Sequence, residues 1–296
     1  MRLEHTVSAG EDGLTLQQLL RGPMGLSGRE IRSAKQRGAV SVDAAPFFSN
    51  QPVREGMCVR VELADYASAS SASPSRPLEV LYEDEALLAV FKPAPLQCHP
   101  SPSAPGGSDT LEARVCAVLG RPAHPVHRLD AETTGIVLFA KLPFVQAHLQ
   151  RQMQVGSFEK VYRAWVYGTP EPQSGEIDAP IARLTPDSFT RVVRADGQRA
   201  VTRYAVLQNL SIGQETVSLV SFHPLTGRTH QLRVHASHIG CPLLGDTRYA
   251  SQESARLSRA LSLAHHQLSA VSLSFVHPVT RARVFLSHSA VFDFNP

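Results

Sequence analysis

The chain has 296 residues, 43% of them hydrophobic and 19% charged, and its 29 basic and 26 acidic residues give a formal net charge of +3. This composition excludes a disordered or fibrous chain, and the longest apolar run, Ala86 to Phe91, is too short for the ~18 residues of a membrane span. No apolar signal peptide follows Met1, and the four cysteines contain no CxxC pair, so we expect a cytoplasmic protein without disulfides or membrane contact.

The first 65 residues have the pattern of a small α/β unit. Ser27 and Glu30 have the spacing of a capping box at the start of a helix that Gly38 ends. Between Arg21 and Arg37, five basic residues stand against one acid, a local charge of +4. This is typical of a surface that contacts phosphates, and a solvated helix face is the alternative. The expected elements are helices at 14–20 and 27–37 and strands at 39–42 and 57–61.

A linker is expected next. Residues 66–77 are rich in serine and alanine and contain Pro74, a composition that cannot build a core. The chain is therefore expected to divide into a first unit, 1–65, and a second unit, 78–296.

The second unit has more predicted strands than helices. Asp109 and Glu112 are placed as a capping box of a helix that Gly120 ends. Because the strands do not alternate regularly with helices, we predict an α+β fold with a mixed, mostly antiparallel sheet. The expected strands lie at 80–82, 86–91, 161–167, 201–207, 216–222, 270–275 and 282–286, and the helices at 109–120 and 144–155.

A polar loop with the sequence HRLDAETTG, at 127–135, comes directly before the apolar strand 136–140. A carboxylate in such a loop is held rigidly because the strand anchors it, so Asp130 is a candidate catalytic group. Arg128 and the two threonines are able to fix its rotamer, and Gly135 permits a sharp entry into the strand. From the spacing alone, a simple turn residue explains Asp130 equally well.

A candidate aromatic residue follows in the strand that begins at Lys160. Lys160 and Tyr162 share one face of this strand because successive side chains alternate. The ring of Tyr162 is placed to stack on a planar ligand, or its hydroxyl to take part in proton transfer. Packing within the sheet is the alternative.

The segment 223–249 predicts a strand, a Thr-Gly turn and a helix from about Thr229 to Gly240. Arg228 and Arg233 point about 140° apart around a helix, so we expect one to pair with a carboxylate and the other to hold a phosphate. The histidines of this helix and Cys241 lack the spacing of a zinc motif, so we predict no metal site. A second basic segment, 183–203, has five arginines against two aspartates, a local +3.

Three of these segments together resemble the RluA-type pseudouridine synthases. HRLD with TTG at 127–135, KxY at 160–162 and TGRTHQLRVH at 226–235, followed by Gly245-Asp246, match that family in order and approximate spacing. The likeness covers about residues 78 to 290, and the first unit is similar to the S-four-like RNA-binding domain that is often fused to these enzymes. The resemblance implies the pseudouridine synthase fold and a reaction that detaches uracil from its sugar within RNA and reattaches it through carbon 5, without a cofactor.

The resemblance also implies roles for individual residues. Asp130 matches the essential aspartate, which attacks the ribose or the base or removes a proton from carbon 2 of the sugar. Tyr162 matches the tyrosine that stacks on the flipped base and assists proton removal. Arg233 matches the basic residue that keeps the aspartate ionised and oriented. RNA contacts are implied for Arg128, Arg191, Arg194, Arg228 and His230 in the second unit and for Arg29, Arg32 and Lys35 in the first.

Two other functions fit parts of the pattern. A catalytically inactive RNA chaperone has no need for the set of Asp130, Tyr162 and Arg233, and a glycosidic-bond hydrolase needs a second, opposed carboxylate, for which Glu132 is poorly placed. We therefore predict an active RNA pseudouridine synthase. We expect ribosomal rather than transfer RNA as its substrate, because the fused first domain is common among synthases of that kind. We expect a monomer, because no exposed apolar stripe is evident.

Overall fold

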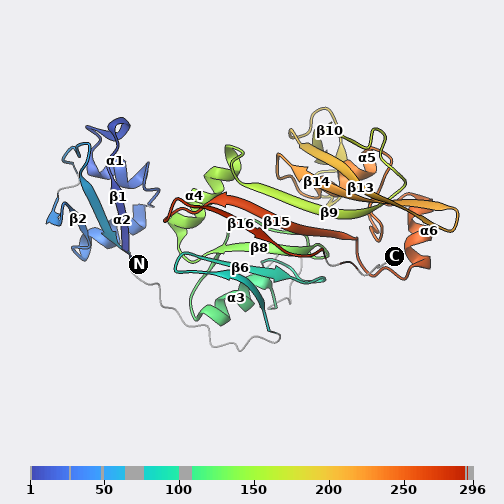
Figure 1. Ribbon diagram of the computed structural model, residues 1–296, viewed down its shortest axis with the longest axis horizontal. Helices are drawn as coiled ribbons and strands as arrows, with labels where there is room; N and C mark the ends of the chain where they lie inside the picture. Colours follow the sequence, from blue (N-terminus) through green and yellow to red (C-terminus); the bar gives the residue numbers. More distant parts are fainter. Residues whose placement is uncertain are drawn as a thin grey trace.

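The computed structural model describes residues 2–26, 28–47, 50–63, 77–99, 109–290 and 292 (Figure 1). The first unit is a four-stranded antiparallel sheet in the order β1-β4-β2-β3 with two helices. The predicted helices and strands are confirmed, whereas Ser27 and most of the predicted linker lie outside the described residues. The elements are β1 (Arg2–Thr6), a 3-10 turn (Ala9–Glu11), α1 (Leu16–Arg21), α2 (Gly28–Gln36), β2 (Val40–Val42), β3 (Ala45–Pro46) and β4 (Cys58–Glu62).

The first unit packs against helix α4 (Pro143–Gln154) of the second unit. Ile31 and Ala34 of α2 face the core, and the same helix buries Glu30. The Glu30 carboxylate accepts a hydrogen bond from the backbone amide of Phe144 at 3.3 Å, and His148 Nε2 donates to the carbonyl of Met24 at 2.9 Å. Because a carboxylate at the first turn of a helix satisfies an otherwise unpaired amide, α4 gains a cap from the other unit.

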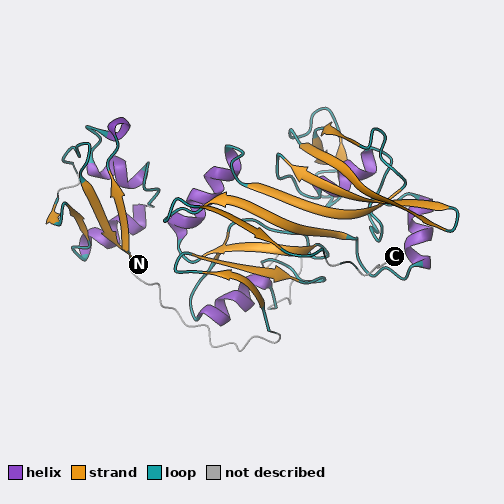
Figure 2. Ribbon diagram, viewed as in Figure 1, coloured by secondary structure: helices purple, strands orange, loops and turns teal. Residues whose placement is uncertain are grey.

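The second unit is built on a ten-stranded sheet in the order β10-β13-β14-β9-β15-β8-β6-β5, with β16 paired to β15 and β7 to β8 (Figure 1). Only the β8–β15 pair is parallel in the described part of this sheet, so the predicted mixed, mostly antiparallel α+β fold is confirmed. Figure 2 shows that strands dominate the unit. The strands are β5 (Glu79–Glu83), β6 (Leu87–Lys92), β7 (His124–Pro125), β8 (Thr134–Ala140), β9 (Glu159–Tyr167), β10 (Ser174–Asp178), β13 (Val201–Ile212), β14 (Glu215–Pro224), β15 (Leu268–Val276) and β16 (Arg283–Ser287).

Helices cover parts of this sheet, and a small hairpin of β11 (Ile181–Arg183) and β12 (Arg191–Val193) stands beside it. Helix α4 packs against β8 and β15, and α5 (Gln231–His238) packs against β12 and β14. The remaining helices are α3 (Leu111–Leu119) and α6 (Gln252–Ala260). None of the helices in the described part is long and apolar enough to cross a membrane.

The cap of α3 differs from the prediction. Thr110 is the capping residue, and its hydroxyl accepts from the amide of Ala113 at 3.2 Å. Asp109 instead forms a two-pronged ion pair with Arg114, both contacts at 2.6 Å, so the predicted capping box of Asp109 and Glu112 is wrong. A guanidinium fork offers the Asp109 carboxylate two charge-assisted hydrogen bonds, which an N-cap position does not. Gly120 ends the helix in the left-handed conformation, as predicted.

Gly135 fixes the entry of the polar loop into β8. Its φ is +120°, and a Cβ at this position would lie 2.3 Å from the carbonyl oxygen of Ala270 on β15. Only glycine allows this approach, because any side chain would collide with the neighbouring backbone. The loop that carries Asp130 is thereby anchored where the parallel pair of strands begins.

Candidate active site

The loop that carries Asp130 is held by hydrogen bonds on both sides of the residue. The carbonyl of Ala131 accepts from the amide of Leu96 at 2.9 Å and from Lys92 Nζ at 2.7 Å. On the other side, the amide of Leu129 donates to Cys98 Sγ at 3.2 Å. Both flanking residues are thus fixed to the segment 92–98, so the position of Asp130 is determined by the sheet rather than by a free loop.

Lys92 is fully buried at the end of β6. Its ammonium donates to the carbonyls of Pro93, Leu96 and Ala131 at 2.7–2.9 Å, which uses all three of its protons. Burial lowers the pKa of Lys92 to about 8, against the opposing charges of Cys98 and Asp130. The side chain is therefore a cation at neutral pH, and it ties the Asp130 loop to β6.

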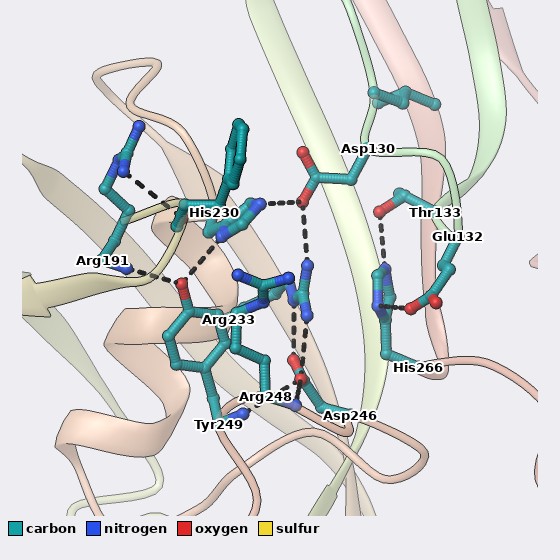
Figure 3. A network of polar contacts seen from close by, with 12 residues as sticks. Asp130, Glu132, Thr133, Arg191, His230, Arg233, Asp246, Arg248, Tyr249 and His266 are labelled. Atoms are coloured by element: carbon teal, nitrogen blue, oxygen red, sulfur yellow. Dashed lines mark hydrogen bonds and ion pairs between the residues drawn. The ribbon is translucent and has the colours of Figure 1, made fainter. Parts of the chain in front are cut away.

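The far side of the loop rests on His266, which is buried. His266 Nε2 and the hydroxyl of Thr133 lie 2.7 Å apart, and His266 Nδ1 lies 3.3 Å from Glu132 Oε2 (Figure 3). Glu132 lines a separate cavity of about 130 Å³ together with His265 and His266. The Glu132 carboxylate thus pairs with His266 and does not line the cavity that Asp130 lines.

Arg233 of α5 joins two carboxylates (Figure 3). Its Nε and Nη2 donate to the two oxygens of Asp246 at 2.7 and 2.9 Å, while its Nη1 lies 3.4 Å from Asp130 Oδ2. Burial alone would lower the pKa of Arg233, but hydrogen bonds and charge from Asp246, together with the charge of Asp130, raise it above its usual range. Arg233 is therefore a permanent cation, and Asp246 determines its direction.

Asp130 presents its two oxygens differently. Arg233 Nη1 at 3.4 Å and His230 Nε2 at 3.9 Å both approach Oδ2, as Figure 3 shows. Oδ1 has no hydrogen bond or ion pair with any residue of the described part. The side chain is 25% exposed. One oxygen is thus held by cationic and polar groups, and the other is available to a substrate.

A cavity of about 300 Å³ collects most of the predicted site residues, which come from four elements. Tyr162 reaches it from β9, and burial, followed by the charge of Asp130, raises the pKa of its phenol above the usual range. The phenol is therefore neutral in the free protein, and its ring forms an apolar wall beside the carboxylate. The predicted residues that line this cavity are Arg128, Asp130, Tyr162, Arg228, His230 and Arg233.

The remaining predicted residues do not line this cavity. Arg194 pairs with Asp196 at 2.5 Å. The guanidinium of Arg191 donates to three carbonyls of the β11–β12 turn, at Ser188, Phe189 and Thr190.

On α2, Arg32 is exposed and Lys35 is half-buried, and the side chain of Arg29 lies outside the described part. These positions belong to the β11–β12 hairpin and to the first unit, and none of them lines the cavity of Asp130.

A larger cavity, about 1180 Å³, adjoins the first and shares Lys160 and Arg228 with it. Burial lowers the pKa of Lys160, and its ammonium has no hydrogen bond or ion pair within the described residues. Burial disfavours the charged form of a lysine, and an anion beside it favours that form again, so this position favours an anionic ligand. Lys160 lies two positions before Tyr162 on the same face of β9.

Four residues of this network were not assigned a role from the sequence: Lys92, Asp246, Tyr249 and His266. Asp246 stands in the Gly245-Asp246 pair of the family pattern, and Lys92 directly follows the apolar strand 86–91, but neither position by itself indicates these contacts. No sequence period marks Tyr249 or His266, because both act from loops. Among the described residues, no group of three or more His, Cys, Asp or Glu side chains is placed to hold a metal ion, and the four cysteines are free thiols.

The chain is similar to known proteins in sequence and in structure. Residues 86–238 match the family model of RNA pseudouridylate synthase. An uncharacterized RNA pseudouridine synthase of Aquifex aeolicus is 34% identical over 93% of this chain and 89% of its own length. Ribosomal large subunit pseudouridine synthase D of Zymomonas mobilis is 36% identical over 77% of this chain and 74% of its own. The structure of human RNA pseudouridylate synthase domain containing 4 aligns with a TM-score of 0.56 and 28% identity, over 72% of this chain and 88% of the human chain.

Proposed function

Because this chain belongs to the RNA pseudouridylate synthase family, we propose that Asp130 is the carboxylate with which it converts uridine in structured RNA to pseudouridine. In this isomerisation the bond between N1 and C1′ breaks, a bond between C5 and C1′ forms, the proton on C5 leaves and N1 takes up a proton. The observation that carries the proposal is the asymmetry of Asp130, whose Oδ2 is held while Oδ1 is free to react. Arg233 lies beside the carboxylate and holds it correctly turned.

Tyr162 supports the proposal as the wall on which the base stacks. The cavity of about 300 Å³ has the size of a small-ligand site, so the uridine must leave the RNA stack to enter it. Flipping a nucleotide costs a few kcal/mol, and an aromatic face returns about 1–3 kcal/mol per stacked base. A neutral phenol is suited to this task because it adds no second charge beside Asp130.

Lys160 supports a path for the RNA backbone. Its ammonium stands where the catalytic cavity opens into the larger one, and a phosphate of the flipped nucleotide or its neighbour would supply the missing anion. Arg128 and Arg228 are exposed at the rim of the catalytic cavity, where they are placed to contact further phosphates. Contacts of this kind set affinity and register, while the cavity selects the base.

The first unit, residues 1–65, is proposed to act as an S-four-like RNA-binding domain joined by the linker 66–77 to the catalytic domain 78–296. Contacts to the RNA backbone would be added on α2 by Arg29, Arg32 and Lys35. Arg191 and Arg194 of the β11–β12 hairpin region would contact RNA beside the active site. Ribosomal RNA is the proposed substrate, which the similarity to a ribosomal large subunit synthase supports. The protein is proposed to act as a monomer in the cytoplasm without a cofactor.

The test is product analysis. The purified protein is incubated with RNA from a strain that lacks its gene, and the nucleosides of the digested RNA and any free base are quantified. A synthase converts uridine to pseudouridine and releases no base. Free uracil would identify a hydrolase, and unchanged RNA that is nevertheless bound would identify a chaperone; either result overturns the proposal. The pairing of Glu132 with His266 argues against the hydrolase, because the second carboxylate is turned to another cavity.

A further inference from the structure

His230 lies next to Asp130 in an unusual backbone conformation. It precedes α5 with φ +58° and ψ 19°, in the left-handed region that a residue with a side chain rarely adopts. Its side chain is 14% exposed, and Nε2 faces Asp130 Oδ2 at 3.9 Å. A backbone conformation of this kind costs about 1–3 kcal/mol and persists only where the surrounding contacts fix it, which is common at functional sites.

Tyr249 contacts the ring nitrogen of His230 that faces away from Asp130. The backbone amide of Arg191 donates to the phenolic oxygen of Tyr249 at 2.9 Å, and the same oxygen lies 2.7 Å from His230 Nδ1 (Figure 3). No other acceptor for the phenolic hydrogen is present among the described residues. Because the hydroxyl accepts from Arg191, its single hydrogen is available to Nδ1 when that nitrogen is unprotonated. In that tautomer the ring proton is on Nε2, the atom that faces Asp130.

The charges around His230 disfavour a second proton. Burial lowers the pKa of His230 to about 4, and although the charge of Asp130 opposes this, the cations Arg233, Arg248 and Arg191 add to it. The charged groups that act on the ring are Asp130 in its loop, Arg233 on α5, Arg248 in the segment after Asp246 and Arg191 on β12. The phenol of Tyr249 is in contact with it. His230 is neutral at the pH of the cell.

We propose that Tyr249 holds His230 as its Nε2–H tautomer, and that the dipole of this N–H, 3.9 Å from Asp130 Oδ2, acts with the charge of Arg233 to turn Oδ2 inward and Oδ1 toward the substrate. His230 is in this account a positioning residue for Asp130, rather than only an RNA contact. The inference rests on the proposed catalytic role of Asp130. It also links the β11–β12 hairpin to the carboxylate, because the Arg191 amide orients the Tyr249 hydroxyl.

The tautomer is measured directly, without any assay of activity. The full chain is labelled with ¹⁵N-histidine, and the ring nitrogens of its 13 histidines are observed by long-range ¹H–¹⁵N correlation between pH 5 and 8. The His230 signals are assigned by their absence from the H230N variant. We expect an Nε2–H ring that does not titrate in this range. In Y249F, which removes the donor to Nδ1, we expect the other tautomer or a protonated ring to become populated.

Two substitutions separate the donor at Nε2 from the contact at Nδ1. Gln places its amide nitrogen near the position of Nε2, whereas Asn places one near Nδ1 and tolerates the left-handed backbone better than most residues. We expect H230N to lower the single-turnover rate about 10²-fold, because a small misplacement of a reacting group costs about that much, with a much smaller effect on the Kd for RNA. H230Q should retain a rate within roughly tenfold of wild type. H238N, the same change at an exposed position of α5, is the matched control.

Three results would overturn the inference: an Nδ1–H or protonated His230 in the wild type at pH 7, a wild-type rate in H230N, or a loss in H230N that appears only in the Kd for RNA. Failure of the proposed function is a different result. It would show as full activity of the Asp130→Asn variant, and the histidine spectra would be unaffected by that outcome.

Discussion

Arg233 Nη1 lies 3.4 Å from Asp130 Oδ2, although 103 positions separate the two residues in the chain. This is the longer of the contacts that the guanidinium makes, because its other nitrogens are fixed to Asp246 at 2.7 and 2.9 Å. Arg233 therefore does not depend on Asp130 for its position. A cation held in this way would stabilise the proposed catalytic carboxylate and stay in place when that carboxylate reacts.

Asp246→Asn tests this anchoring. The substitution leaves Arg233 buried beside an uncharged partner, and breaking a buried ion pair typically costs about 3–5 kcal/mol. We expect the free energy of unfolding in urea to fall by about that amount and the rate of pseudouridine formation to fall as well, because Arg233 is free to turn away. Asp196→Asn, which removes an exposed partner of Arg194, is the control and should change neither quantity. Equal stability of Asp246→Asn and wild type would contradict the anchoring role.

Lys92 gives the stability of the protein a distinct dependence on pH. Burial lowers its pKa from 10.5 to about 8 in the folded protein, so between these values the unfolded chain binds more protons than the folded one. The contribution of Lys92 to stability is then fully present above pH 10.5 and is lost as the pH falls through 8.

The measurement compares wild type with Lys92→Met by urea unfolding from pH 7 to 10.5, since other titrations cancel in the difference. We expect the free energy of unfolding of wild type, relative to the variant, to rise by about 3 kcal/mol across this range, at about 1.4 kcal/mol per pKa unit. Parallel curves would show that the pKa of Lys92 is the same in the folded and unfolded chains.

Gly135→Ala should disrupt the parallel pair of strands that anchors the loop of Asp130. The added Cβ would lie 2.3 Å from the carbonyl of Ala270, and the φ of +120° is unfavourable for alanine in itself. We expect a loss of about 3 kcal/mol or more in the free energy of unfolding. Gly120→Ala has a positive φ, in the left-handed helical region, and no atom within 4 Å of its Cβ, so it reports the cost of a left-handed backbone without a collision, about 1 kcal/mol. Similar losses for the two variants would remove the steric explanation.

The first unit is expected to contribute affinity and not chemistry. Charge reversal of α2 in the double variant Arg32→Glu and Lys35→Glu should weaken RNA binding and reduce the slope of log Kd against log salt by roughly one per lost phosphate contact. The rate at saturating RNA should stay at the wild-type value. Arg54→Glu, at an exposed position of the same unit outside α2, should leave the slope unchanged. An unchanged slope in the α2 variant would show that this helix does not contact RNA.

Much of the fold follows from local patterns in the sequence. The strands β9, β13 and β14 and the helix α4 were predictable because alternation and helical spacing are properties of neighbouring residues. The cap of α3 was not, since Asp109 was free to pair with Arg114 in preference to a backbone amide. Such competition depends on the three-dimensional placement of a side chain that periodicity does not reveal.

The site residues likewise fall into a group that the sequence predicts and a group that it does not. Asp130, Tyr162 and Arg233 were recognised from the family pattern, and the structure brings them to one cavity. The groups that hold them were not recognised, because their partners are set by tertiary contacts. Lys92 binds three carbonyls of two loops, and Tyr249 acts through a backbone amide of the hairpin. No spacing in the chain encodes such contacts.

The most direct test of the central claim measures tritium release from RNA labelled on carbon 5 of its uridines, because formation of the new carbon bond expels that hydrogen. Wild type, Asp130→Asn and Asp130→Ala are compared at RNA concentrations where each is shown to be saturated. We predict release by the wild type and a rate at least about 10³-fold lower in both variants, with RNA binding retained. Release by either variant at the wild-type rate would show that Asp130 is not the catalytic carboxylate.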